Sequence, residues 1–213
     1  MSRKLRLALM ALGTMLALSL AIGTASANNL SVDDQDYDVR FRELNFLTPL
    51  GPVTCPVTLL GSFHTQTIRK SFKSLIGHID HARVEDATCA NAPTDGATIQ
   101  QASLPWHVQY DSFVGRLPAI ERITLLLVGA GFIIDKGSTE CLARTSATEP
   151  AKGEIVRNTT TGQATTLVAD PDPTIDTVDT TGTLCDLGNV VGRFEGAGVI
   201  EDLAGNLVFV RLI

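Results

Sequence analysis

Two histidines flank an aspartate in the stretch HIDH, and imidazole and carboxylate groups are common zinc ligands. Along an extended strand, successive side chains point to opposite faces. His78 and Asp80 would then share one face while His81 turns to the other. The three groups cannot chelate one ion without a bend or a helix. We therefore expect exposed polar residues here, and no bound metal or other cofactor.

Four aspartates fall close together in the last third of the chain: Asp170, Asp172, Asp176 and Asp179. Carboxylates suit Ca²⁺, but an EF-hand loop needs ligands at every second position and a glycine at the sixth, which this spacing lacks. The segment from Pro171 to Thr183 is rich in turn residues, so we predict a long, solvated acidic loop. A weak calcium site is the alternative.

A basic group stands out in an otherwise acidic chain: Arg69, Lys70, Lys73, His78, His81 and Arg83. Its charge could bind an anionic polymer of the cell envelope. The alternative is the solvated face of two neighbouring strands.

No motif identifies an enzyme. The sequence has no G-x-S-x-G elbow for a serine nucleophile. We expect the cysteines to be disulfide-bonded, which argues against a Cys-His enzyme. We therefore assign no catalytic residue; a hydrolase whose Asp, Glu and His residues meet only in the fold is kept as an alternative.

The N-terminus predicts export. Arg3, Lys4 and Arg6 precede an apolar run from Leu7 to Ile22, which is followed by Ala25-Ser26-Ala27. This is the order of a secretory signal peptide, and the run is too short for a membrane anchor. We expect cleavage after Ala27 and a single secreted domain, residues 28–213, without a transmembrane segment. Because the leader removes three cations and no acids, that domain has a formal charge of -9, which argues against nucleic acid as a partner.

All four cysteines lie in the exported part, and an even number in an oxidising compartment predicts two disulfides. We predict Cys55 with Cys89 and Cys141 with Cys185, since each pair brackets one half of the chain. The other two connectivities stay open. No two cysteines are close enough for a zinc knuckle.

Abundant Thr, Val, Ile and Leu, with Gly or Pro about every ten residues, predict an all-β fold: a single-domain antiparallel β-sandwich or β-barrel. Leu75 to Ala87 could also form a short helix, but Gly77 favours a strand. The predicted strands are Phe41–Thr48, Thr54–His64, Gln66–Lys73, Ile76–Thr88, Trp106–Val114, Ile120–Ile134, Cys141–Thr148, Glu154–Asn158, Val190–Ile200 and Asn206–Leu212.

Two further segments carry expectations. The strand from Ile120 to Ile134 is apolar on both faces, so we place it in the middle of the structure. Gly129 and Gly131 within it indicate a bend or the close approach of another element. The polar stretch SVDDQDYDV, residues 31–39, is expected to be a loose mature terminus.

The stretch LPWHVQYDSFVGRLP contains the chain's one tryptophan. Pro105 and Pro118 suit positions just before strands, where a missing N–H removes no ladder bond. Trp106, Val108 and Tyr110 alternate with polar residues, and this phase slips before Gly115, which predicts a bulge or a twist. We interpret the stretch as scaffold, with Trp106 in the core and His107 in solvent.

The order of these features resembles a group of exported actinobacterial β-rich proteins without an assigned function. The resemblance rests on TCPVTLLGSF, a later cysteine, LPW, GRLPAI and LLLVGAGFII, and spans Phe41 to Ile213. It implies the signal peptide, the disulfides and the structural positions Leu104, Pro105, Trp106, Gly115, Leu117 and Pro118. It implies no catalytic or ligand-binding residue.

The sequence therefore predicts a secreted, disulfide-stapled β-domain, non-catalytic, that acts in the envelope or outside the cell by interaction. A carrier of a small apolar ligand, of the lipocalin-like barrel type, is the alternative. The shape of the interior distinguishes the two. A filled sandwich favours interaction, whereas a closed barrel with a cavity of a few hundred Å³ favours a carrier.

Overall fold

The computed structural model describes residues 29–48, 51–85, 89, 95–116, 119–136, 139–169, 176–179 and 193–213. The predicted signal segment, Pro118 and Cys185 lie outside these residues. The regular secondary structure of these residues is all β, apart from one short 3-10 turn, η1 (Gln101–Ser103). The predicted fold class is confirmed, and the molecule is a barrel rather than a sandwich.

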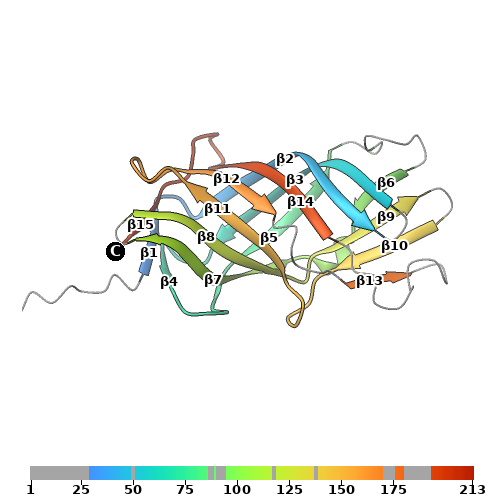
Figure 1. Cartoon of the computed structure of the whole chain (residues 1–213), viewed down its shortest axis with the longest axis horizontal. Coiled ribbons are helices and arrows are strands. Elements are labelled where there is room, and N and C mark those ends of the chain that lie inside the picture. Colours follow the sequence, from blue (N-terminus) through green and yellow to red (C-terminus); the bar gives the residue numbers. More distant parts are fainter. Residues whose placement is uncertain are drawn as a thin grey trace, which may run out of the picture.

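Eight antiparallel strands close the barrel, and barrel strands that follow one another in the sequence pair with one another (Figure 1). The last pairs with the first, Ile200 opposite Val39, so the barrel is an up-and-down meander. Its strands are β2 (Asp36–Thr48), β3 (Gly51–Phe63), β5 (Leu75–Val84), β7 (Trp106–Arg116), β8 (Ala119–Val128), β11 (Ala151–Arg157), β12 (Ala164–Ala169) and β14 (Arg193–Glu201).

Two small sheets lie at opposite ends of the barrel (Figure 1). Alternate connections of an antiparallel meander lie at the same end, so short strands inserted in them can pair with one another. The first sheet has the order β15-β1-β4 and the second β13-β10-β9-β6. Their bounds are β1 (Asn29–Val32), β4 (Thr67–Arg69), β15 (Val210–Leu212), β6 (Asp95–Ile99), β9 (Gly131–Lys136), β10 (Thr139–Arg144) and β13 (Asp176–Asp179).

The long strand predicted from Ile120 to Ile134 is two strands, β8 in the barrel and β9 in an end sheet. Gly129, at φ +87°, turns the chain between them. The Ala130 N–H then donates to Thr145 Oγ1 at 2.9 Å, which fixes the corner. At Gly131 a Cβ would lie 2.6 Å from Gln100 Oε1. The expectations of a bend and of a close approach at these glycines are both confirmed.

The N-terminal stretch is not loose, contrary to expectation. Leu30 and Val32 in β1 are buried, and β1 pairs with β4 on one side and β15 on the other. Asp33 then accepts a 2.7 Å hydrogen bond from the backbone N–H of Phe209. The partners of this stretch come from distant parts of the chain, so its polar composition gave the wrong prediction.

Several other element boundaries differ from expectation. Strands β6 and β12 were not predicted, and β13 lies inside the segment expected to be a long loop. The segment predicted as a strand from Gln66 to Lys73 contains only the three-residue β4. Leu75 to Val84 is a strand, as Gly77 indicated.

The first predicted disulfide, Cys55–Cys89, is present. It joins β3 to the chain beyond β5, across a sequence separation of 34 residues. On the chain-entropy estimate such a loop stabilises the fold by about 4 kcal/mol. The second predicted pair stays a prediction, because Cys185 lies outside the described residues.

Candidate ligand-binding site

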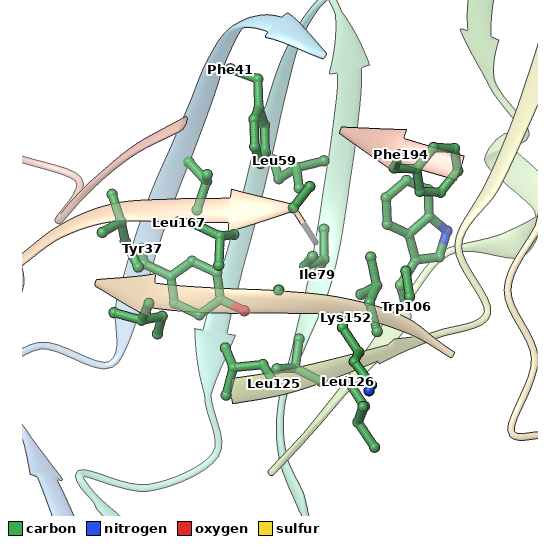
Figure 2. A pocket seen from close by; sticks show the side chains of 18 of the residues that line it. Tyr37, Phe41, Leu59, Ile79, Trp106, Leu125, Leu126, Lys152, Leu167 and Phe194 are labelled. Carbon is green, nitrogen blue, oxygen red and sulfur yellow. The ribbon is translucent and has the colours of Figure 1, made fainter. Parts of the chain in front are cut away.

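The barrel contains a cavity of about 90 Å³, measured as space open to the centre of a water molecule (Figure 2). A single water needs about 10–15 Å³ in this measure, so the cavity can hold several water-sized groups. All eight barrel strands contribute to its wall. The lining residues are Tyr37, Val39, Phe41, Leu44, Leu59, Phe63, Ile79, Trp106, Val108, Leu125, Leu126, Leu127, Phe132, Ala151, Lys152, Gly153, Ile155, Leu167, Ala169, Phe194 and Ile200.

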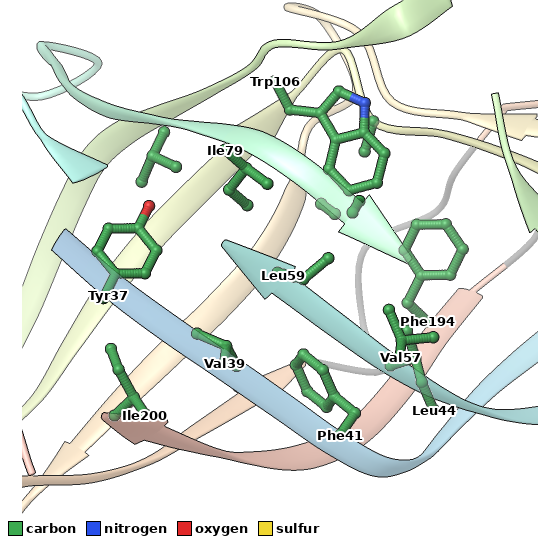
Figure 3. Close-up of a cluster of buried hydrophobic side chains, with 14 of the residues drawn as sticks. Tyr37, Val39, Phe41, Leu44, Val57, Leu59, Ile79, Trp106, Phe194 and Ile200 are labelled. Atoms are coloured by element: carbon green, nitrogen blue, oxygen red, sulfur yellow. The ribbon is translucent and has the colours of Figure 1, made fainter. Parts of the chain in front are cut away.

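Strand β2 shows how the sequence builds this wall. Tyr37, Val39 and Phe41 alternate along the strand and are buried, as expected for one face of a strand (Figure 3). A bulge between Phe41 and Leu44 then holds Arg42 and Glu43 outside, so that Leu44 returns to the interior.

Strand β11 contributes a glycine to the cavity wall. Gly153 faces inward between Ala151 and Ile155, opposite Leu125 of β8. A Cβ at this position would lie 3.2 Å from Leu167 Cδ1, which is tighter than most such contacts. Glycine here therefore leaves room for the side chains of the neighbouring strands.

Four aromatic rings form the floor at the end nearest β9. Phe132 packs on Trp106, Phe46 and Phe194 with ring centroids 5.2, 4.9 and 4.9 Å apart. Tilted and edge-on pairs at such distances are favourable arrangements of aromatic rings. Phe132 belongs to the end sheet, so the sheet closes the barrel with an apolar plug.

The opposite end is closed by β1, β4 and β15. A second void of about 10 Å³ lies beneath them, lined by Leu30, Ile68 and Val210 among others. Phe63, Leu125 and Ile155 line both this void and the main cavity. The two spaces therefore share a wall inside the same barrel.

Polar chemistry in the main cavity is sparse. Among its lining residues only Tyr37 and Lys152 carry an ionisable side chain. The Tyr37 hydroxyl points inward and donates to the backbone oxygen of His78 at 3.3 Å (Figure 2). Burial, and to a smaller extent the charge of Asp80, raise the pKa of this hydroxyl well above its ordinary value. The site is thus an apolar chamber whose polar lining groups are the neutral hydroxyl of Tyr37 and the side chain of Lys152, an exposed residue.

The predicted scaffold residues lie as expected where they are described. Trp106 is fully buried, His107 is exposed, and Pro105 directly precedes β7 after a cis peptide bond. The ladder between β7 and β8 shifts register before Ser112 and again at Gly115, which has φ +126°. Trp106 has a second role that the sequence did not indicate, since it also lines the cavity.

The HIDH residues are arranged differently from the prediction. Leu60 pairs with His81 and Gly61 with Ile79, so Asp80 is the extra residue of a bulge. Ile79 and Ala82 are buried, whereas Asp80 and His81 are both exposed. His81 therefore does not turn to the opposite face, because that face is the barrel interior.

Sequence reasoning did not find the cavity as a site. Its residues come from eight strands, and each strand shows only ordinary alternation. The relevant signal was the pattern YDVRF, residues 37–41, which alternates apolar and charged side chains. It predicts a buried face but not whether that face surrounds an empty space.

No family model matches this sequence, and no curated protein and no solved structure is detectably similar to it. Within the residues that the structure describes, no helix is long and apolar enough to span a membrane.

Proposed function

We propose that this protein binds a small apolar molecule inside its barrel and acts as a non-catalytic carrier. The observation that carries the proposal is the cavity inside the barrel, which is lined almost entirely by apolar side chains. Ligand pockets are mostly apolar, with few polar groups that fix orientation, and the Tyr37 hydroxyl is such a group here. The cavity is smaller than the few hundred Å³ expected of a general carrier. A single ring or a short alkyl chain is the ligand class that fits it.

Trp106 allows a direct test, because it is the one tryptophan of the chain and lines the cavity. Toluene is the probe, and Trp106 emission is followed during titration. We expect a saturable change in emission, since the ring of the probe would replace empty space near the indole.

Two alanine variants make the test specific. Ala151→Leu adds a side chain to the cavity and should reduce toluene affinity at least tenfold. Ala197→Leu adds the same atoms on the exposed face of β14 and should leave affinity unchanged. A change in Trp106 emission that does not saturate in the parent would contradict the proposal. So would equal toluene affinity in the parent and a folded Ala151→Leu protein.

Export is part of this proposal. The leader and the Cys55–Cys89 disulfide support it, because disulfides persist in oxidising compartments. Mass analysis of the exported protein should find Asn28 as the first residue. A mature form that retains Met1 would contradict export by cleavage.

A second candidate function, association with the cell envelope, is favoured by the loop between β4 and β5. Phe72 at its tip is 67% exposed, and Lys73 Nζ lies 5.6 Å from the centre of its ring. Lys70 Nζ lies 5.1 Å from the ring of Phe113 on β7. No acidic residue occurs between His64 and Ile79, although Asp111 follows Tyr110 on the neighbouring strand. An exposed ring among cations suits an anionic lipid surface, where the ring enters the headgroup region.

Vesicle sedimentation tests this second candidate. We expect binding to phosphatidylglycerol vesicles and little binding to phosphatidylcholine vesicles. Phe72→Ser should lower the affinity for phosphatidylglycerol vesicles at least fivefold. Leu203→Ser is the matched control, because Leu203 is 66% exposed in another turn. Equal losses in the two variants, or binding to a soluble anionic polymer alone, would contradict a lipid surface as the partner.

A further inference from the structure

Three of the four histidines are brought together on the outer face of the barrel. His64 directly follows β3, His78 lies on β5, and His107 lies on β7. His78 pairs with His107 across the β5–β7 ladder. In sequence these residues are separated by 14 and 29 positions, so the grouping is made by the barrel alone.

Two of the imidazole rings are in direct contact. His64 Nε2 and His78 Nδ1 are 3.1 Å apart, and the ring centroids are separated by 5.2 Å. His64 is exposed and His78 is partly exposed, so an ion from solvent can reach both nitrogens.

Asp80 orients the second ring. Its Oδ2 lies 3.0 Å from His78 Nε2. An ionised carboxylate only accepts hydrogen bonds, so His78 Nε2 carries the proton and His78 Nδ1 presents its lone pair to His64. A carboxylate on the second nitrogen of an imidazole is the usual outer-shell partner of a metal-binding histidine.

The facing nitrogens require a cation between them or a proton on His64 Nε2, because two lone pairs at this distance repel. Imidazole nitrogens bind zinc at about 2.0–2.1 Å. With the two nitrogens 3.1 Å apart, both bonds can form with an angle of about 98° at the ion. That angle lies between the octahedral and tetrahedral values. When the ion binds, the proton of a neutral His64 moves to its Nδ1, so no net proton is lost.

We propose that His64 and His78 bind one divalent transition-metal ion, with Asp80 orienting His78 and His107 supplying a third nitrogen. Imidazole ligands suit Zn²⁺, Ni²⁺ and Cu²⁺. Directly opposite residues of an antiparallel pair have Cβ atoms about 4.5–5.5 Å apart, so the His107 ring can turn to the same ion. In the described part of the chain no three His, Cys, Asp or Glu side chains already stand as a ligand set. The third bond therefore needs this rotation, and water completes the shell.

The site differs from the one considered on sequence grounds. In the HIDH stretch alone, His78 and Asp80 stand beside His81, a spacing that does not suit chelation of one ion. The fold instead joins His78 to His64, and Asp80 supports the imidazole rather than the ion. The inference does not depend on the barrel cavity, because all these side chains lie on its outer face.

Calorimetric titration of the metal-free, oxidised protein with ZnCl₂ tests the proposal. We expect one ion per chain, with at least tenfold weaker binding in His64→Ala and in His78→Ala. Asp80→Asn should weaken binding about 10–100-fold, the range for lost outer-shell partners. His81→Ala is the matched control, since His81 is exposed on the same strand and should keep the parent affinity.

Further outcomes separate a site from surface binding. An equal loss in His81→Ala, or no stoichiometric binding by the parent, would overturn the proposal. Unchanged affinity in His107→Ala would remove that residue from the ligand set. Melting curves in chelator show that the variants are folded, and the d–d spectrum of bound Co²⁺ should change in His107→Ala if its nitrogen is a ligand.

Discussion

The indole Nε1 of Trp106 donates a hydrogen bond to Ser103 Oγ at 2.8 Å, and Ser103 Oγ donates in turn to the Gln100 backbone oxygen at 2.7 Å. The turn η1 thus satisfies the one polar atom of a ring that is otherwise enclosed by apolar side chains. Its neighbour in sequence, His107, faces solvent. This contrast between adjacent residues gives the first prediction.

Trp106→Ala should lower the free energy of unfolding by about 3–5 kcal/mol, as large-to-small changes in cores do. His107→Ala should change it by no more than about 0.5 kcal/mol in metal-free buffer, as ordinary surface changes do. Denaturant melts of the oxidised variants measure both. A Trp106→Ala protein that melts like the parent would show that the tryptophan is not a core anchor.

The second prediction concerns stability at high pH. Burial raises the pKa of the Tyr37 hydroxyl in the folded state, whereas in the unfolded chain it titrates near its ordinary value of about 10. Above that pH the unfolded state loses a proton that the folded state keeps, so stability falls as pH rises. The contribution of one such group is about 1.4 kcal/mol per pH unit.

Tyr37→Phe should therefore lessen the loss of stability above about pH 10, and the two proteins should show the same pH dependence at neutral pH. Tyr110, whose pKa is also raised by burial, is present in both proteins, so its contribution to the pH dependence cancels in the comparison. Denaturant melts across this range provide the comparison. Parallel stability curves above pH 10 would be inconsistent with a buried, neutral Tyr37.

The third prediction tests a close approach of two strands. A Cβ at Gly61 would lie 2.3 Å from the backbone oxygen of His78 and 2.8 Å from Tyr37 Oη. A ladder carbonyl cannot move aside cheaply, so Gly61→Ala should cost about 3 kcal/mol, at the upper end of overpacking effects.

Gly205→Ala is the matched control for this change. Gly205 has φ +84° and nothing within 4 Å of the added atom, so only the left-handed backbone penalty of about 1–2 kcal/mol applies. Thermal melts of the two variants show which substitution destabilises the protein more. An equal or smaller cost at Gly61 would mean that the strands separate easily there.

The fourth prediction concerns the cysteines. Cys55→Ser with Cys89→Ser should destabilise the protein by about 4 kcal/mol, and full reduction should destabilise it further because it also breaks the predicted second bridge. Thiol titration of the exported, denatured protein should find no free thiols, and peptide maps should link Cys141 to Cys185. A peptide that joins Cys141 to Cys55 or to Cys89 would refute both pairings, because each cysteine can form only one disulfide.

The sequence by itself determined the all-β class, and it indicated disulfide bonding in which Cys55–Cys89 was the preferred of several open pairings. These features depend on local alternation, β-branched composition and an even number of cysteines. Local pattern also determined that Trp106 is buried, that Gly129 marks a corner and that a bulge precedes Gly115. Each of these depends on a few neighbouring residues, whose steric preferences are the same in any fold.

Only the tertiary structure decided that the strands close into a barrel with a chamber inside. Alternation predicts a buried face, but whether facing side chains fill the space depends on strand number and on inward positions such as Gly153. Likewise, the N-terminal stretch is ordered because β1 pairs with β15, at the far end of the chain. The contact between His64 and His78 has the same origin, because hydrogen bonding across strands joins residues that no sequence spacing relates.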